Sequence, residues 1–162
     1  MNSGVCWHRR HTVLIEWCPD YDQRAEDIRN NKPESQQAIR LSLFKLVKGE
    51  LPEGVVKALQ AYEQAWRTHE QTMRARDQTW QAYIQAWQTW QPHGQISQAR
   101  DQAVQADNQA SQAHNQAVQA CVQASQARDQ VLKNEKEAIE RLHSLECPNC
   151  PWNGQTIFPD QC

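Results

Sequence analysis

The stretch QARDQAVQADNQASQAHNQAVQACVQASQARDQ, residues 98–130, carries Gln or Ala at more than half of its positions and repeats every seven residues. At this period, residues 99–133 divide into ARDQAVQ, ADNQASQ, AHNQAVQ, ACVQASQ and ARDQVLK, and residues 61–88 into AYEQAWR, THEQTMR, ARDQTWQ and AYIQAWQ. The units share a small first residue and Gln at the fourth position, and many have a larger or apolar sixth residue. Such a heptad repeat of helix-forming residues predicts long α-helices.

The constant glutamines indicate which side of the helices faces water. If the sixth position of each unit is heptad position a, the second is d, the two small positions are c and g, and the constant Gln is f, farthest from an a/d seam. The glutamines concerned are Gln64, Gln71, Gln78, Gln85, Gln102, Gln109, Gln116 and Gln123. We therefore predict a solvated helix surface here and not a disordered glutamine tract.

The two blocks of repeats differ in side-chain size. Residues 61–88 have Trp66, Met73, Trp80 and Trp87 at the sixth position, whereas residues 99–127 have Ala at nearly every first and fifth position. Close packing favours large residues against small ones, which predicts a Trp/Ala seam between the blocks. Because two helices bury only one stripe each, we also expect a homo-oligomer, or a partner helix, to use this seam.

The segment QPHGQ, residues 91–95, separates the two blocks. Pro92 cannot continue a helix, and Gly94 suits a tight reversal, so the segment predicts an antiparallel helical hairpin. The first helix is expected to run from near Pro52 to Gln91 and the second from about Gln95 to Leu145. A single bent helix that dimerises in parallel is the alternative.

The ends of the chain have different patterns. HTVLIEW, residues 11–17, is the one expected strand, a short helix begins near Asp20 or Asp22, and residues 32–49 predict a helix of roughly four turns. Because a hairpin returns the chain to its start, both ends are expected to form one small head that covers the apolar end of the second helix.

The predicted fold is therefore mostly all-α. A long antiparallel heptad-repeat helical hairpin, resembling a coiled coil, carries a small α+β head with most of the cysteines, formed by both chain ends. We expect an N-terminal head segment at 1–50, a shaft at 51–133 with its turn at 91–95, and a C-terminal segment at 134–162 that contains the end of the second helix and a cysteine knuckle.

Five of the six cysteines lie outside the heptad repeats, and two of them form the motif Cys147-Pro-Asn-Cys150. This C-x-x-C turn resembles the knuckle of zinc ribbons and rubredoxin-like sites, which implies a zinc ion held by thiolates. The predicted metal ligands are Cys6, Cys18, Cys147 and Cys150, with Cys162, His8, His11 and His143 as alternates. Unliganded structural thiols, or a disulfide or redox pair, are the other interpretations. Cys121 is expected to be a small buried hydrophobe.

Charge and motifs limit the classes of function. The formal net charge is −2, no apolar run is long enough to span a membrane, and the N-terminus does not resemble a signal peptide, so we expect a cytoplasmic protein. No phosphate-binding loop, nucleophile elbow or H-E-x-x-H motif is present, which favours a non-enzymatic structural or interaction protein. The alternative is a zinc-knuckle nucleic-acid-binding or regulatory protein that contacts phosphates through Trp7, Arg9 and Arg10.

Overall fold

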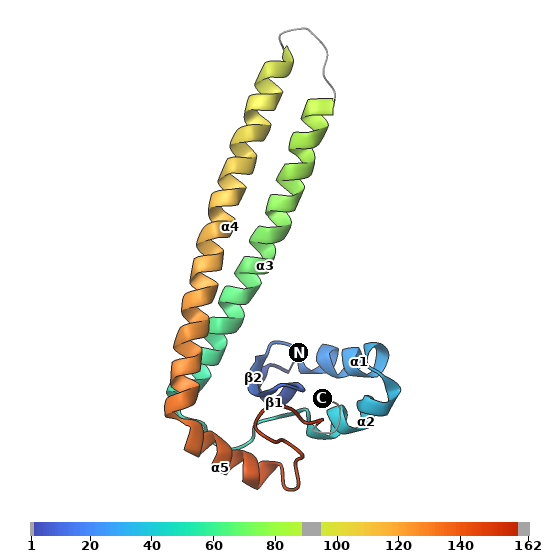
Figure 1. Ribbon diagram of the computed structural model, residues 1–162, viewed down its shortest axis with the longest axis vertical. Helices are drawn as coiled ribbons and strands as arrows, with labels where there is room; N and C mark the ends of the chain where they lie inside the picture. Colours follow the sequence, from blue (N-terminus) through green and yellow to red (C-terminus); the bar gives the residue numbers. More distant parts are fainter. Residues whose placement is uncertain (1, 89–94, 159–162) are drawn as a thin grey trace. The chain divides into compact units, whose positions relative to one another are not determined.

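The computed structural model describes residues 2–88 and 95–158, which form five helices and three short strands (Figure 1). The chain divides into two compact units. One, here called the head, comprises Met1–Gln60 and Arg128–Cys162, and the other, the shaft, comprises Ala61–Ala127.

The head contains a three-stranded antiparallel sheet in the order β2-β1-β3, in which β1 spans Gly4–Arg10, β2 Val13–Cys18 and β3 Lys45–Leu46. The prediction of one strand was therefore wrong, because β1 and β3 are also present. The sequence of β1 does not alternate between apolar and polar residues, so the pattern did not predict a strand there. As the central strand, β1 is nevertheless paired along both edges, so its backbone groups are satisfied by strands on either side.

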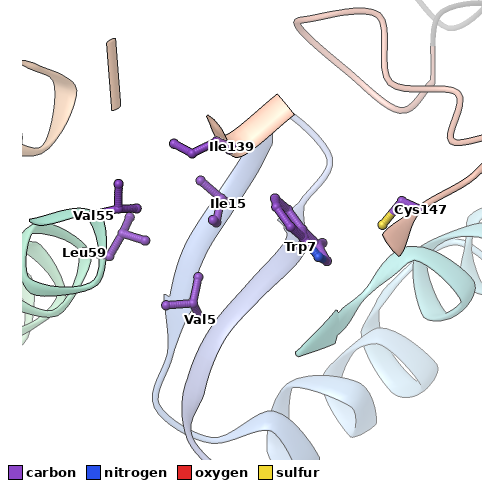
Figure 2. Packing of buried hydrophobic residues seen from close by; sticks show 7 residues of the cluster. All are labelled: Val5, Trp7, Ile15, Val55, Leu59, Ile139 and Cys147. Carbon is purple, nitrogen blue, oxygen red and sulfur yellow. The ribbon is translucent and has the colours of Figure 1, made fainter. Parts of the chain in front are cut away.

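A cluster of buried hydrophobic residues covers each face of this sheet. On one face, β1 and β2 pack against residues of the first long helix and of the last helix, as Figure 2 shows. This cluster contains Val5, Trp7, Ile15, Val55, Leu59, Ile139 and Cys147. The second cluster comprises Cys6, Cys18, Ala25, Ile28 and Phe44. Val131, Leu132 and Leu142, from the end of the second long helix and from the last helix, pack against the first cluster.

Two short helices follow the strands. Helix α1 spans Tyr21–Asn31 and begins as predicted, with the side chain of Asp20 accepting a hydrogen bond from the Gln23 amide. Helix α2 spans only Glu34–Leu43, shorter than expected. The chain leaves the helix at Phe44, whose ring is buried and stacks on Tyr21, and then pairs with β1. Tertiary packing thus outweighs the helical pattern of residues 45–49.

The long helices are α3, Glu53–Gln88, and α4, Gln95–Asn134, followed by α5, Lys136–Glu146. The second helix was predicted to continue to Leu145, but it is interrupted at Glu135, whose φ and ψ are −100° and 14°. Figure 1 shows that α5 turns away from the end of α4. The interruption allows Ile139 and His143 to be buried in the head. Residues 91–94 of the predicted turn lie outside the described residues.

Within the shaft, α3 and α4 pack together in opposite directions. The His69 ring lies 5.2 Å from that of His114, Thr79 donates a hydrogen bond to Asp107, and Arg100 lies 3.5 Å from the centre of the Trp87 ring. As the residue number increases along α3, the residue number of the contacting partner on α4 decreases. This order is that of an antiparallel hairpin, and it argues against the single bent helix.

The packed face of the shaft differs from the predicted one. Within the shaft, every residue at the second and fifth positions of the repeat is partly or fully buried, and these positions are spaced alternately three and four residues apart. On α3 they are Tyr62, Ala65, His69, Thr72, Arg76, Thr79, Tyr83 and Ala86. On α4 they are Arg100, Ala103, Asp107, Ala110, His114, Ala117, Cys121 and Ala124. Glu63, Glu70, Ser111, Val118 and Ser125, which lie beside them, are also partly buried. The small residue at each fifth position lets the two helices approach closely.

The sixth-position tryptophans consequently lie beside this packed face and not within it. Trp66, Trp80 and Trp87 are 43%, 51% and 46% exposed, which overturns the prediction that they fill a Trp/Ala seam inside the hairpin. The first-position alanines of α4 are also exposed: Ala99, Ala106, Ala113, Ala120 and Ala127. The prediction for the fourth-position glutamines is confirmed, because all eight are exposed.

Candidate metal centre

Three side chains from distant parts of the sequence meet in the head. His8 belongs to β1, His143 to the last turn of α5, and Cys150 follows that helix. Nε2 of His8 lies 3.0 Å from Nε2 of His143 and 3.2 Å from Sγ of Cys150. Within the described residues, these three form the group of His, Cys, Asp or Glu whose ligand atoms lie close enough to share one metal ion, all within 4.8 Å of one another.

The backbone of β1 explains how His8 reaches this group. The pairing of β1 with β2 shifts register between Trp7 and Arg10, which marks a β-bulge, and His8 has a φ of 51°. A bulge with a residue in the left-handed region redirects a side chain that regular alternation would place on the other face. His8 and Trp7 thus both contact His143, with ring centres 5.1 Å away in each case.

The position of Cys150 is set by the turn that ends α5. Asn149 has a φ of 62°, and the Cys150 amide donates a hydrogen bond to the Cys147 carbonyl at 3.2 Å. Asn is among the residues that adopt the left-handed region most readily, so the C-x-x-C segment closes into a tight turn. The predicted knuckle is therefore a turn in which Cys150, and not Cys147, joins the two histidines.

The group is largely shielded from water. His8 is 2% exposed and His143 8%, and the Trp152 ring lies 5.5 Å from that of His8. Nδ1 of His8 is buried without a hydrogen-bond partner among the described residues. The polar interactions of the His8 ring are therefore made through Nε2, toward His143 and Cys150.

The electrostatic environment keeps both imidazoles neutral. Burial lowers the pKa of His8 to about 4, and the charges of His143 and Lys45 act in the same direction. Burial also lowers the pKa of His143. A neutral imidazole has a free lone pair on one ring nitrogen, which is the form that binds a metal ion.

The thiol of Cys150 responds differently. Burial raises its pKa, while a hydrogen bond from the Trp152 backbone opposes that effect. In the absence of a cation the group is thus a thiol. A divalent cation would displace the proton, because coordinated thiols are deprotonated.

The three side chains fit zinc. Zinc ligands are typically about 2.0–2.1 Å away for nitrogen and about 2.3 Å for sulfur, which places neighbouring ligand atoms of a tetrahedral site about 3.3–3.6 Å apart. The separations from His8 of 3.0 Å and 3.2 Å are a few tenths of an ångström shorter. A small outward movement of the side chains would accommodate the ion.

The other predicted ligands are distributed elsewhere. Cys6 and Cys18 are fully buried in the second cluster, where a mutual hydrogen bond and burial raise the pKa of Cys6. Cys147 is buried in the first cluster, His11 is exposed, and Cys162 lies outside the described residues. The structure therefore brings together one of the four first-choice ligands and two of the alternates. None of the described cysteines, Cys121 included, forms a disulfide.

The three residues proposed to contact nucleic acid also have different environments. Trp7 is fully buried, and its indole Nε1 donates to Glu146 at 2.9 Å, so it offers no face for a base to stack on. Arg9 donates to the carbonyl of Trp17. Arg10 alone of the three is exposed, and it lies 3.5 Å from Glu16.

Comparison with protein-family models, with curated proteins and with solved structures finds no match to this chain. None of the described helices is long and apolar enough to cross a membrane. Inferences about function therefore depend on the chemistry of the residues themselves.

Proposed function

We propose that this protein is a non-enzymatic structural or interaction protein, in which a coiled-coil helical hairpin acts as a spacer and self-associates. The observation that carries the proposal is the regular exposure of Trp66, Trp80 and Trp87 along α3. Met73, at the same repeat position, is 39% exposed. Large apolar side chains that recur every seven residues on one exposed stripe are typical of a surface that another helix covers.

The occupant that best fits this stripe is a second copy of the chain. The exposed first-position alanines of α4 form a stripe of small residues with the same seven-residue period. Tryptophans of one copy can pack against alanines of another, so the Trp/Ala seam is proposed between molecules and not within the hairpin. A two-fold dimer would make this contact twice, whereas copies that share a single contact leave one stripe open at each end, so that assembly can exceed a dimer.

Sedimentation across micromolar concentrations tests this proposal. The wild-type protein should form oligomers, and the triple variant Trp66→Gln, Trp80→Gln, Trp87→Gln should be monomeric with an unchanged helical circular dichroism signal. The matched control replaces Gln71 and Gln78, which are exposed at the fourth position, with Ala, and it should still assemble. A wild-type protein that stays monomeric throughout would overturn the proposal.

The same proposal includes a structural zinc ion in the head, bound by His8, His143 and Cys150. The convergence of two neutral imidazoles and a thiol supports it. Structural zinc sites are closed by four protein ligands, and Cys147, which is buried in the first cluster, would have to turn toward the ion to supply the fourth. The ion would tie β1 to the end of α5 and strengthen a small core. A cytoplasmic location, which free thiols favour, is part of this proposal.

Elemental analysis of purified protein tests the metal site. We expect one zinc per chain in the wild type and a loss of zinc in Cys150→Ser and His143→Gln. Cys121→Ser, a substitution of a free thiol in the shaft, should retain the metal. A wild type without zinc after growth and purification in its presence would disprove the site, and retention in Cys147→Ser would exclude that residue alone.

A further inference from the structure

A pocket of about 330 Å³ on the head is surrounded by positive charge. It is lined by Arg10, His11, Thr12, Arg24, Lys32 and Arg40. These residues come from the end of β1, the β1–β2 turn, α1, α2 and the segment between those two helices. Neither Asp nor Glu lines the pocket, although acidic residues slightly outnumber basic ones in the chain as a whole, 19 to 17.

Arg40 forms the buried wall of this pocket. The residue is 8% exposed, and its guanidinium donates to Gln36 Oε1 through Nε at 3.0 Å and through Nη2 at 2.7 Å. Its Nη2 also lies 3.4 Å from His11 Nδ1, and its Cζ lies 5.1 Å from the centre of the Phe158 ring. Within the described residues no carboxylate pairs with Arg40, so a buried cation here is held by neutral groups only.

Arg24 is fixed beside it. Its Nε and Nη2 donate to the Arg9 carbonyl at 3.2 Å and 2.8 Å, and its Nη1 contacts the Asp27 carboxylate. The proximity of Arg24 lowers the pKa of Arg40, in addition to the larger effect of burial. Two guanidinium groups are thus held near each other in a partly desolvated place. An isolated buried charge is costly, and an anion between like charges would offset that cost.

Two further cations stand at the rim. Arg10 is exposed and lies 3.5 Å from Glu16, and Lys32 is half-buried with no carboxylate partner among the described residues. Two carboxylates, those of Asp27 and Glu16, contact the lining residues Arg24 and Arg10, and the charge of Lys32 also lowers the pKa of Asp27. Four cationic side chains against two engaged carboxylates leave an excess of positive charge. A concave site lined by one sign of charge concentrates ligands of the opposite sign.

We propose that this pocket binds a small molecule through a phosphate monoester group, which Arg40, Arg24, Arg10 and Lys32 hold. Planar guanidinium groups match the oxygens of phosphate and bind it with charge-assisted hydrogen bonds. The pocket is at the small end of the range for ligand sites, about 300–1,000 Å³, and has room for a small organic part beside the phosphate. The proposal goes beyond the spacer function and depends on neither the zinc ion nor self-association.

Calorimetric titration at constant ionic strength tests the site with three probes: ribose 5-phosphate, inorganic phosphate and sulfate. We expect saturable binding of one ribose 5-phosphate per head, weaker binding of inorganic phosphate, and the weakest binding of sulfate. Equal affinity for all three would overturn the phosphate-monoester assignment, since it would indicate an unspecific anion site. A single-stranded RNA that binds while ribose 5-phosphate does not would replace the proposal by a nucleic-acid surface.

Substitutions of the lining residues test whether ribose 5-phosphate binds in this pocket. Lys32→Ala and Arg10→Ala, both at the rim, should each weaken binding of ribose 5-phosphate about tenfold or more, as expected for a hydrogen bond to a charged group. Arg29→Ala removes an exposed cation from the same helix as Arg24 and serves as the matched control, with affinity unchanged.

A variant that is expected to strengthen binding tests the pocket without an Arg40 substitution, which could unfold the head. Asp27→Asn removes the carboxylate that competes for Arg24 and should tighten binding several-fold. Unchanged affinity in Lys32→Ala, Arg10→Ala and Asp27→Asn alike would overturn the assignment to this pocket.

Discussion

Nε2 of His8 lies 3.0 Å from Nε2 of His143, although 135 residues separate them in the chain. Two neutral imidazoles in this arrangement share one proton at most, because one nitrogen donates only if the other accepts. The contact joins a bulged strand near the N-terminus to the last turn of α5. A cation that both nitrogens bind would make this junction much stronger.

Zinc should therefore stabilise the head. At a free zinc concentration about 100 times the dissociation constant, binding contributes about 2.7 kcal/mol. At roughly 2–4 °C per kcal/mol for a protein of this size, differential scanning calorimetry of metal-free protein should show a rise in Tm of about 5–10 °C when zinc is added.

The control for this prediction is the set of thiol variants. Cys121→Ser should retain the zinc-dependent rise in Tm, and Cys150→Ser should lose most of it. An equal rise in both variants would show that zinc binds outside the cluster of His8, His143 and Cys150.

A second prediction compares Leu59 and Trp66, which occupy the same repeat position one heptad apart in α3. Leu59 is 2% exposed and packs in the first cluster of the head, whereas Trp66 is 43% exposed. Leu59→Ala should lower the free energy of unfolding by about 2–5 kcal/mol, because it leaves a cavity in the core. Trp66→Ala should change it by less than about 1 kcal/mol in dilute protein.

Urea unfolding followed by circular dichroism measures both values. Protein concentrations below the range of assembly are needed, since Trp66 is expected to contribute at the proposed contact between copies. Similar losses in the two variants would mean that the sixth position is equally buried along the helix.

This comparison shows what the sequence pattern could and could not predict. The two long helices, the solvated glutamines and the N-cap of α1 at Asp20 follow from local rules and are confirmed. The period alone does not say which pair of positions forms the packed face. Large apolar residues favoured the sixth position, but the small residues at the fifth position allow closer approach of the helices, and these face the partner helix.

The metal cluster was only partly predictable for a related reason. The C-x-x-C motif indicated Cys147 and Cys150, and His143 lies in the last turn of α5, just before that motif. His8 depends on a β-bulge with a positive φ in a strand that the pattern did not show. No local sequence rule predicts such a bulge at histidine, since its geometry is fixed by pairing with β2 and by packing in the head.

A third prediction concerns Glu146, whose carboxylate joins three segments of the head. It accepts hydrogen bonds from Trp7 Nε1 at 2.9 Å, the Lys48 amide at 3.0 Å and the Gly49 amide at 2.6 Å. In Glu146→Gln an amide donor would face these donors, so we expect a loss of about 2–3 kcal/mol in the free energy of unfolding.

Glu50→Gln provides the matched control, because Glu50 is exposed and undergoes the same chemical change. Chemical unfolding at neutral pH should show a change of less than about 0.5 kcal/mol for this control. A comparable loss in both variants would indicate a general effect of charge and not of the three hydrogen bonds.

The last prediction is a pH dependence at Asp27, on α1. Its pKa in the folded protein lies below the ordinary value of 3.8, first because Asn31 donates a hydrogen bond to it and also because Arg24 is close, while burial opposes the shift.

A carboxyl with a lowered folded pKa contributes stability that is complete above its unfolded pKa and disappears as the pH falls through the folded pKa. Asp27→Asn should therefore cost about 0.5–1 kcal/mol at neutral pH, in line with a partly exposed ion pair, and progressively less as the pH falls below 3.8. Urea unfolding at several pH values above and below 3.8 measures this difference, and Glu26→Gln, an exposed change on the same helix, should show no comparable trend. A cost for Asp27→Asn that persists unchanged at low pH would show that the side chain stabilises the fold through packing and not through its charge.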